Sequence, residues 1–106
     1  MQTRYNVEWT PRDAVARVYH QHQSAIDHEG ASVWDYVDVD QLSKVKHVGT
    51  ETAALDLCRG VVGQDEFGEV RVTHAVFVDD GYGGYWETMA VSHYYDGDDQ
   101  LDWQPY

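Results

Sequence analysis

Two alternating segments on either side of a glycine-rich loop dominate the sequence. Valines alternate with other side chains before residues 79–84, and aromatic and aliphatic residues alternate with polar ones after them. A period of two places successive side chains on opposite faces of a strand. Glycines accept the backbone conformations that a tight reversal needs. The pattern predicts a long antiparallel hairpin, with strands over about 69–79 and 85–95.

The register of this hairpin follows from the loop if Val78 pairs with Tyr85. Val72 then pairs with Val91, which puts β-branched residues opposite each other. The same register predicts a pair of aromatic residues, Phe77 with Trp86.

A second pattern has helical spacing. Val15, Val18, Tyr19 and Ile26 fall at spacings of three, four and seven residues, with a proline and an acidic residue at the start of the stretch and a glycine after it. Proline suits the first turn of a helix and glycine suits its end. We expect an amphipathic helix over about 11–29 that buries these four side chains.

The remaining segments carry weaker signals. Alternation predicts a first strand over about 5–9 and another over about 32–39, with a short helical turn after Asp40 that carries Leu42 and Val45. Thr50 can cap a helix through about Arg59, although Leu55 and Leu57 also alternate as they would in a strand. We favour the helix, and strand remains the alternative over 50–62.

These elements predict the fold class and the domain organisation. The chain has 106 residues, enough for one domain with a modest core. We therefore expect a single acidic α+β domain over 1–106. Its small antiparallel sheet, of roughly three to five strands, is packed by the helix of about 11–29. The single cysteine, Cys58, has apolar neighbours, which is typical of a buried thiol.

The charge limits the classes of partner. The chain has 7 Lys and Arg against 19 Asp and Glu, a formal net charge of −12. Nucleic acids and anionic membranes are repelled by such a charge, whereas basic protein surfaces are attracted. No apolar run approaches the length of a membrane span, and the first residues lack the apolar stretch of a signal peptide. We expect a cytoplasmic protein, in the host cytoplasm if it is viral.

Motifs of known chemistry are missing from the sequence. It contains no nucleophile elbow, no HExxH zinc motif and no P-loop. Residues 81–84 lack the lysine and helix of a phosphate loop, and residues 96–102 lack the order of ligands in a calcium loop. We therefore predict no enzymatic activity, no catalytic residues, no cofactor and no specific metal site.

One cluster keeps a small metal-binding or hydrolytic protein open as an alternative. In the predicted register two histidines and a carboxylate share one face of the hairpin, as in a two-His-one-carboxylate site. The cluster comprises His74, Glu87 and His93.

Carboxylates grouped with aromatic residues are the candidate partner-binding site, because aromatic side chains anchor interfaces and charges steer association. On a strand, Asp38 and Asp40 would lie roughly 6.7 Å apart, about two base-pair rises of DNA. The candidate residues are Asp35, Asp38, Asp40, Asp96, Asp98, Asp99, Asp102, Trp34, Tyr36 and Tyr95.

The leading hypothesis is a non-enzymatic acidic inhibitor that engages a basic, nucleic-acid-binding site of a partner protein and does not bind nucleic acid itself. In size and charge the chain is similar to small acidic phage proteins that block host defence, such as anti-CRISPR or anti-restriction DNA mimics. The main alternative is a salt-adapted, halophilic domain whose acidity serves solvation only.

Overall fold

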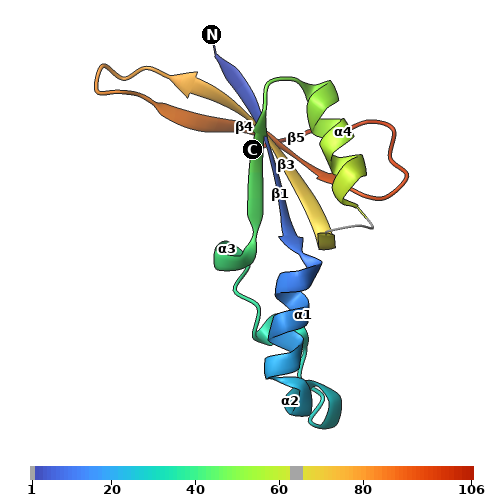
Figure 1. Cartoon of the computed structure of the whole chain (residues 1–106). Coiled ribbons are helices and arrows are strands. Elements are labelled where there is room, and N and C mark those ends of the chain that lie inside the picture. Colours follow the sequence, from blue (N-terminus) through green and yellow to red (C-terminus); the bar gives the residue numbers. More distant parts are fainter. Residues whose placement is uncertain (1, 63–65) are drawn as a thin grey trace.

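The computed structural model describes residues 2–62 and 66–106 and shows a five-stranded antiparallel sheet with helices (Figure 1). The sheet order is β2-β1-β3-β4-β5. The strands are β1 (Thr3–Pro11), β2 (Lys44–Val48), β3 (Glu66–Val78), β4 (Tyr85–Tyr94) and β5 (Gln104–Pro105). The helices are α1 (Arg12–Gln21), α2 (Gln23–His28), the 3-10 helix η1 (Val33–Asp35), α3 (Val39–Leu42) and α4 (Glu51–Val61). The predicted α+β class is confirmed.

The predicted hairpin is confirmed as β3 and β4, and its loop is held by two aspartates. The Gly81 N–H donates to the Asp79 carboxylate at 2.9 Å. The N–H groups of Tyr82 and Gly84 donate to the Asp80 carboxylate at 2.9 and 3.1 Å. These bonds stabilise the charged form and lower the pKa of Asp80. Positive φ at the three glycines of the loop lets the chain reverse.

The register is correct beside the loop and wrong beyond it. Val72 pairs with Ser92 and not with Val91, because β4 contains a bulge at Met89. One extra residue in β4 moves every later side chain to the other face relative to a regular ladder. The two pairs beside the loop are confirmed: Val78 with Tyr85 and Phe77 with Trp86.

The core lies between one face of the sheet and α4 (Figure 1). The Thr50 hydroxyl accepts the Ala53 N–H at 3.1 Å and caps α4, so the helical interpretation of this segment is confirmed. Ala54 and Cys58, four residues apart, point from α4 into the core and are fully buried. The buried core residues are Val7, Trp9, Ala54, Cys58, Val61, Val70, Val72, Tyr94 and Leu101.

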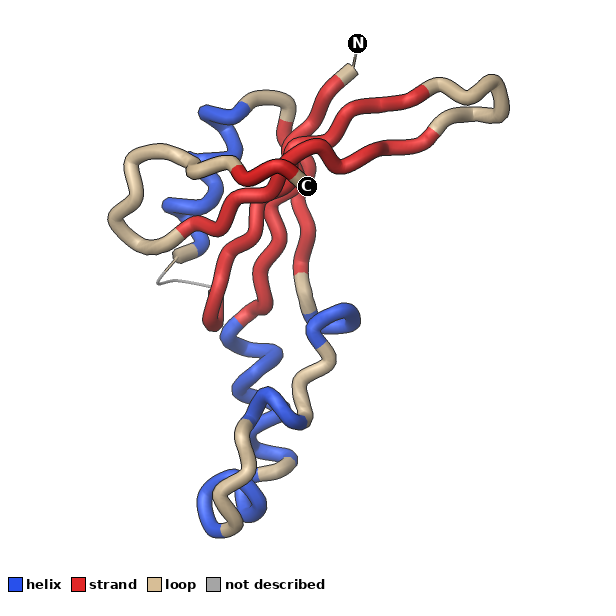
Figure 2. Tube along the Cα trace, turned by 180° about the vertical axis from the view of Figure 1, so that it is seen from behind, coloured by secondary structure: helices blue, strands red, loops and turns tan. Residues whose placement is uncertain are grey.

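The segment predicted as one helix over 11–29 is two helices that extend beyond the end of the sheet (Figures 1 and 2). The break falls at His22, whose ring stacks on Tyr36 with centroids 4.0 Å apart. Only the first turns of α1 are buried, at Ala14 and Val15. Val18, Tyr19 and Ile26 are half-buried, because the segment packs against the short η1 region instead of lying over the sheet. α4 covers the sheet in its place.

The strand predicted over 32–39 is wrong, and local hydrogen bonds give the reason. The Ser32 hydroxyl accepts the Trp34 N–H at 3.3 Å, and the Asp35 carboxylate accepts the Ser32 N–H at 3.0 Å, a capping box for η1. Such side-chain bonds offer the backbone an alternative to a β ladder. The helical turn predicted after Asp40 is part of α3, which includes Leu42, whereas Val45 lies in β2. The first predicted strand is confirmed within β1.

Among the described residues, no helix has the length and apolar character needed to cross a membrane.

Candidate protein-binding site

The loop between β4 and β5 folds the C-terminal aspartates back against the sheet. The Asp98 carboxylate accepts the Tyr95 N–H at 3.0 Å, and the Asp98 carbonyl accepts the Tyr94 hydroxyl at 3.2 Å. The Asp102 N–H donates to the buried Ser92 hydroxyl at 3.0 Å. Leu101 is buried in the core and anchors the loop from within. The backbone that carries these carboxylates is therefore fixed at several points.

The folded loop surrounds a hollow of about 560 Å³, which we call the C-terminal groove. Three carboxylates, two amides, a histidine and an exposed tyrosine ring surround it, and hydrogen-bond acceptors are plentiful. Carboxylates bind guanidinium and ammonium groups by charge-assisted hydrogen bonds, and a tyrosine face attracts the same cations. The lining residues are His93, Tyr95, Asp98, Asp99, Gln100, Asp102 and Gln104.

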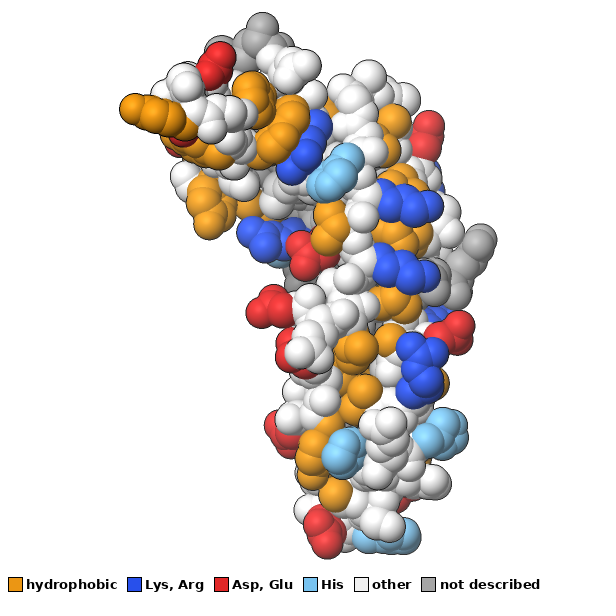
Figure 3. Space-filling model, turned by 60° about the vertical axis from the view of Figure 1, so that its left-hand side comes forward, with side chains coloured by type: hydrophobic (Ala, Val, Ile, Leu, Met, Phe, Trp, Pro, Cys, Tyr) orange, Lys and Arg blue, Asp and Glu red, His pale blue; other side chains and the backbone are white. Residues whose placement is uncertain are grey.

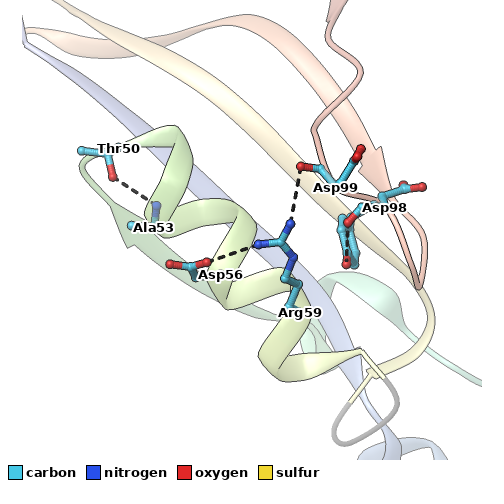
Figure 4. A network of polar contacts seen from close by, with 7 residues as sticks. Thr50, Ala53, Asp56, Arg59, Asp98 and Asp99 are labelled. Carbon is cyan, nitrogen blue, oxygen red and sulfur yellow. Dashed lines mark hydrogen bonds and ion pairs between the residues drawn. The ribbon is translucent and has the colours of Figure 1, made fainter.

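Helix α4 adds two carboxylates that the sequence interpretation missed. Arg59 of α4 donates to the Asp99 carbonyl at 3.4 Å and pairs with Asp56 at 3.5 Å (Figure 4). Glu51, at the start of α4, accepts the Trp103 indole N–H at 3.0 Å. These contacts hold the exposed, acidic side of α4 beside the loop. The helical period places Asp56 opposite the buried Ala54 and Cys58, whereas Glu51, three residues before Ala54, falls on their side of the helix. Only the tertiary contacts place both carboxylates beside residues 95–103.

The predicted cluster around Asp35, Asp38 and Asp40 lies elsewhere, and two of its carboxylates make local hydrogen bonds. Asp35 caps η1, and the Asp38 carboxylate accepts the Gln41 N–H at 3.4 Å. Asp40 lies in α3, so the spacing that a strand would give Asp38 and Asp40 does not occur. Trp34 is 44% exposed and Tyr36, stacked on His22, is 38% exposed.

The two acidic clusters therefore do not form one surface. The η1–α3 segment lies beside α1 and α2, whereas the loop of residues 95–103 lies beside α4 (Figure 1). Of the predicted residues, Tyr95, Asp98, Asp99 and Asp102 come together in the C-terminal groove, and Asp96 is exposed on the same loop without lining it.

The proposed histidine cluster does not form, because the bulge separates its members. His74 shares its sheet face with Ser92 and stacks on Tyr5 with centroids 4.7 Å apart. His93 lies on the opposite face, where it pairs with Arg71 and lines the C-terminal groove. Within the described residues, no three His, Cys, Asp or Glu side chains are grouped closely enough to hold a metal ion. The two-His-one-carboxylate interpretation is wrong.

Comparison of the chain with protein-family models, curated proteins and solved structures finds no match.

Proposed function

We propose that this protein is a non-enzymatic binding protein whose C-terminal groove engages a basic site of a partner protein. The observation that supports the proposal is the convergence of Asp98, Asp99 and Asp102 around one hollow with Tyr95, which is 63% exposed. An acidic hollow whose loop is held by hydrogen bonds and that carries an exposed aromatic ring is suited to an arginine or lysine side chain that projects from a partner.

The net charge of the protein also favours binding to a basic partner. A charge of −12 attracts a basic surface from a distance and raises the association rate, most strongly at low salt. The groove then supplies short-range contacts, and Tyr95 supplies an apolar anchor. Charge thus governs association, and the aromatic contact governs dissociation.

The partner surface whose chemistry fits best is a site that binds nucleic-acid phosphates. Such sites gather arginine and lysine side chains over an extended surface, and a carboxylate-rich protein can occupy them in place of the phosphates. The concrete form of the proposal is an inhibitor of the anti-CRISPR or anti-restriction kind.

Salt adaptation is the second candidate, because exposed carboxylates also lie far from the groove. They occur on α1, on α2 and its C-terminal cap, on η1 and in the hairpin loop. These carboxylates include Asp13, Asp27, Glu29, Asp35, Asp79 and Asp80. A general coat of charge would act through solvation, and then no single cluster should matter for binding.

Titration of the ¹⁵N-labelled protein with a hexa-arginine peptide tests the proposal directly. We expect amide shifts concentrated over residues 93–104 and an affinity that falls as salt is added. The Asp99→Asn/Asp102→Asn variant should bind about tenfold more weakly, because two carboxylates of the groove are neutralised. The matched control, Asp13→Asn/Glu29→Gln, removes the same charge far from the groove and should bind nearly as the wild type does.

Shifts spread evenly over the surface, reduced equally by both variants, would refute the groove and favour a general charge effect. DNA cleavage by a panel of CRISPR effectors and restriction endonucleases tests the partner class. Inhibition by the wild type that is weakened in Asp99→Asn/Asp102→Asn supports the inhibitor, and faster dissociation is expected for Tyr95→Ala. Groove-dependent binding to the peptide without inhibition of any of these enzymes would place the basic partner outside this class.

A further inference from the structure

Strand β2 forms one edge of the sheet, at the opposite side from the C-terminal groove. Its inner side pairs with β1, from Tyr5 opposite Val48 to Trp9 opposite Lys44. No strand of the described chain lies on its outer side. Four of its five residues are exposed, and Val45 is 48% exposed. A strand at an edge presents unpaired N–H and C=O groups that can pair with another chain.

Both lysines of the chain lie on this edge strand. Lys44 pairs with Trp9 and Lys46 with Val7, so the two lysines share one face of β2, whereas Arg4 of β1 lies on the other face of the sheet. Figure 3, which brings the β2 side of the molecule forward, shows Lys and Arg side chains on this side with hydrophobic side chains between them and some Asp or Glu side chains beside them. Five of the seven cations of the chain belong to β2, β1 and α1: Arg4, Arg12, Arg17, Lys44 and Lys46.

Along the chain the carboxylate closest to β2 is Glu51, three residues after Val48, and it accepts the Trp103 indole N–H. In the sheet the closest carboxylate does not share the face of the two lysines. Glu8 pairs with Val45, so it belongs to the other face. Asp40 belongs to α3, before the strand begins. In a chain with 19 acidic residues, the basic character of this edge is a local exception.

We propose that the β2 edge accepts an extended, acidic segment of a protein partner as a sixth strand of the sheet. Backbone hydrogen bonds to β2 supply affinity, as in other cases of strand addition. Lys44 and Lys46 lie two residues apart, so carboxylates that alternate along the added strand meet them on the same face. Apolar residues between the carboxylates meet Val45 on the other face.

The lysines also decide which strands are rejected. Lysine on an edge strand prevents association with neutral or basic strands. A second copy of β2 would place like charges opposite each other, which is unfavourable. An acidic strand removes that repulsion and gains cross-strand ion pairs, so the feature that protects the edge also selects the partner.

The test uses the full-length protein and a blocked hexapeptide of alternating glutamate and valine. We expect backbone amide shifts and slowed hydrogen exchange over residues 44–48, with affinity that decreases as salt is added. A lysine–valine peptide should not bind. The glutamate–valine peptide with a central proline should bind much more weakly, because proline removes a donor and breaks the ladder.

Matched variants distinguish binding of the peptide at the β2 edge from a general effect of the protein's positive charges. Lys44→Gln/Lys46→Gln should weaken binding about tenfold. Arg59→Gln/Arg71→Gln removes the same charge from α4 and β3 and should leave binding nearly unchanged. Equal binding of the proline peptide, equal loss in both variants, or stronger binding of a single-stranded oligonucleotide would each overturn the proposal. The groove variant Asp99→Asn/Asp102→Asn should bind the acidic peptide normally, so this result is independent of the proposed function.

Discussion

At the scale of single residues, Cys58 shows how burial controls chemistry. Its side chain is fully buried between α4 and the sheet, and this burial raises the pKa of the thiol from 9.0 to about 11. The thiolate is the reactive form, so both its low population and its burial protect the group. Because the pKa is higher in the folded state, the associated stability is present below pH 9 and is lost as the pH rises through about 11.

We predict that Cys58 of the folded protein reacts with a thiol reagent at pH 8 at least about 100-fold more slowly than in the unfolded chain, since two pH units separate the thiol pKa values. The reaction in 8 M urea is the internal control. Rapid reaction of the folded protein would show that α4 opens readily and that Cys58 does not belong to a stable core.

At the scale of elements, the N-terminal cap of α4 contributes to the stability of the fold and to the position of the C-terminal groove. α4 contributes core residues and holds Glu51 and Asp56 beside the loop that forms the groove. Thr50 makes the side-chain cap bond to Ala53 (Figure 4).

We predict that Thr50→Ala lowers the free energy of unfolding by about 1 kcal/mol, because an N–H in the first turn loses its acceptor. Urea denaturation monitored by circular dichroism gives the value. Thr52→Ala is the matched control. Thr52 is exposed, lies two residues after Thr50 within the helix, and is not the capping residue. Alanine at this position should not destabilise the helix, because alanine has the higher helix propensity. Equal effects of the two substitutions would contradict the role of Thr50.

At the scale of the whole molecule, the charge opposes folding and the core favours it. Repulsion among carboxylates at a net charge of −12 weakens as the Debye length falls from about 10 Å at 0.1 M salt to about 3 Å at 1 M. If the acidity serves partner binding, the core that α4 covers should be sufficient for folding at low salt. The melting temperature should then rise by several degrees at 1 M salt, because repulsion is screened.

We therefore predict a cooperative thermal transition at 0.1 M sodium chloride, followed by circular dichroism. Asp13→Asn/Glu29→Gln should melt at a slightly higher temperature at low salt, because the reduced repulsion outweighs the loss of the Asp13 charge from the first turn of α1, and at nearly the same temperature at 1 M, where both effects are screened. A chain that is unfolded at 0.1 M and folds only near molar salt would instead support salt adaptation.

The local sequence determined the elements whose signals lie within a few residues. The alternation before and after residues 79–84 determined the hairpin, because a strand's faces repeat every two residues. Thr50 determined the start of α4, because a cap is a contact between neighbours. The acidic character of the loop after β4 was equally readable, since composition alone reveals it.

Only the tertiary structure decided how these elements combine. The bulge at Met89 placed His74 and His93 on opposite faces of the sheet. A pattern of alternating residues in the sequence does not show where a strand contains one unpaired residue. Packing selected α4 over the 11–29 segment to cover the sheet, although both are amphipathic. The groove joins residues 93–104, its contact with α4 spans some forty residues of sequence, and pairing with β1 puts Lys44 and Lys46 at the other edge of the sheet. These are contacts between segments far apart in the chain, and the competition among possible packings, which local propensities do not contain, determines them.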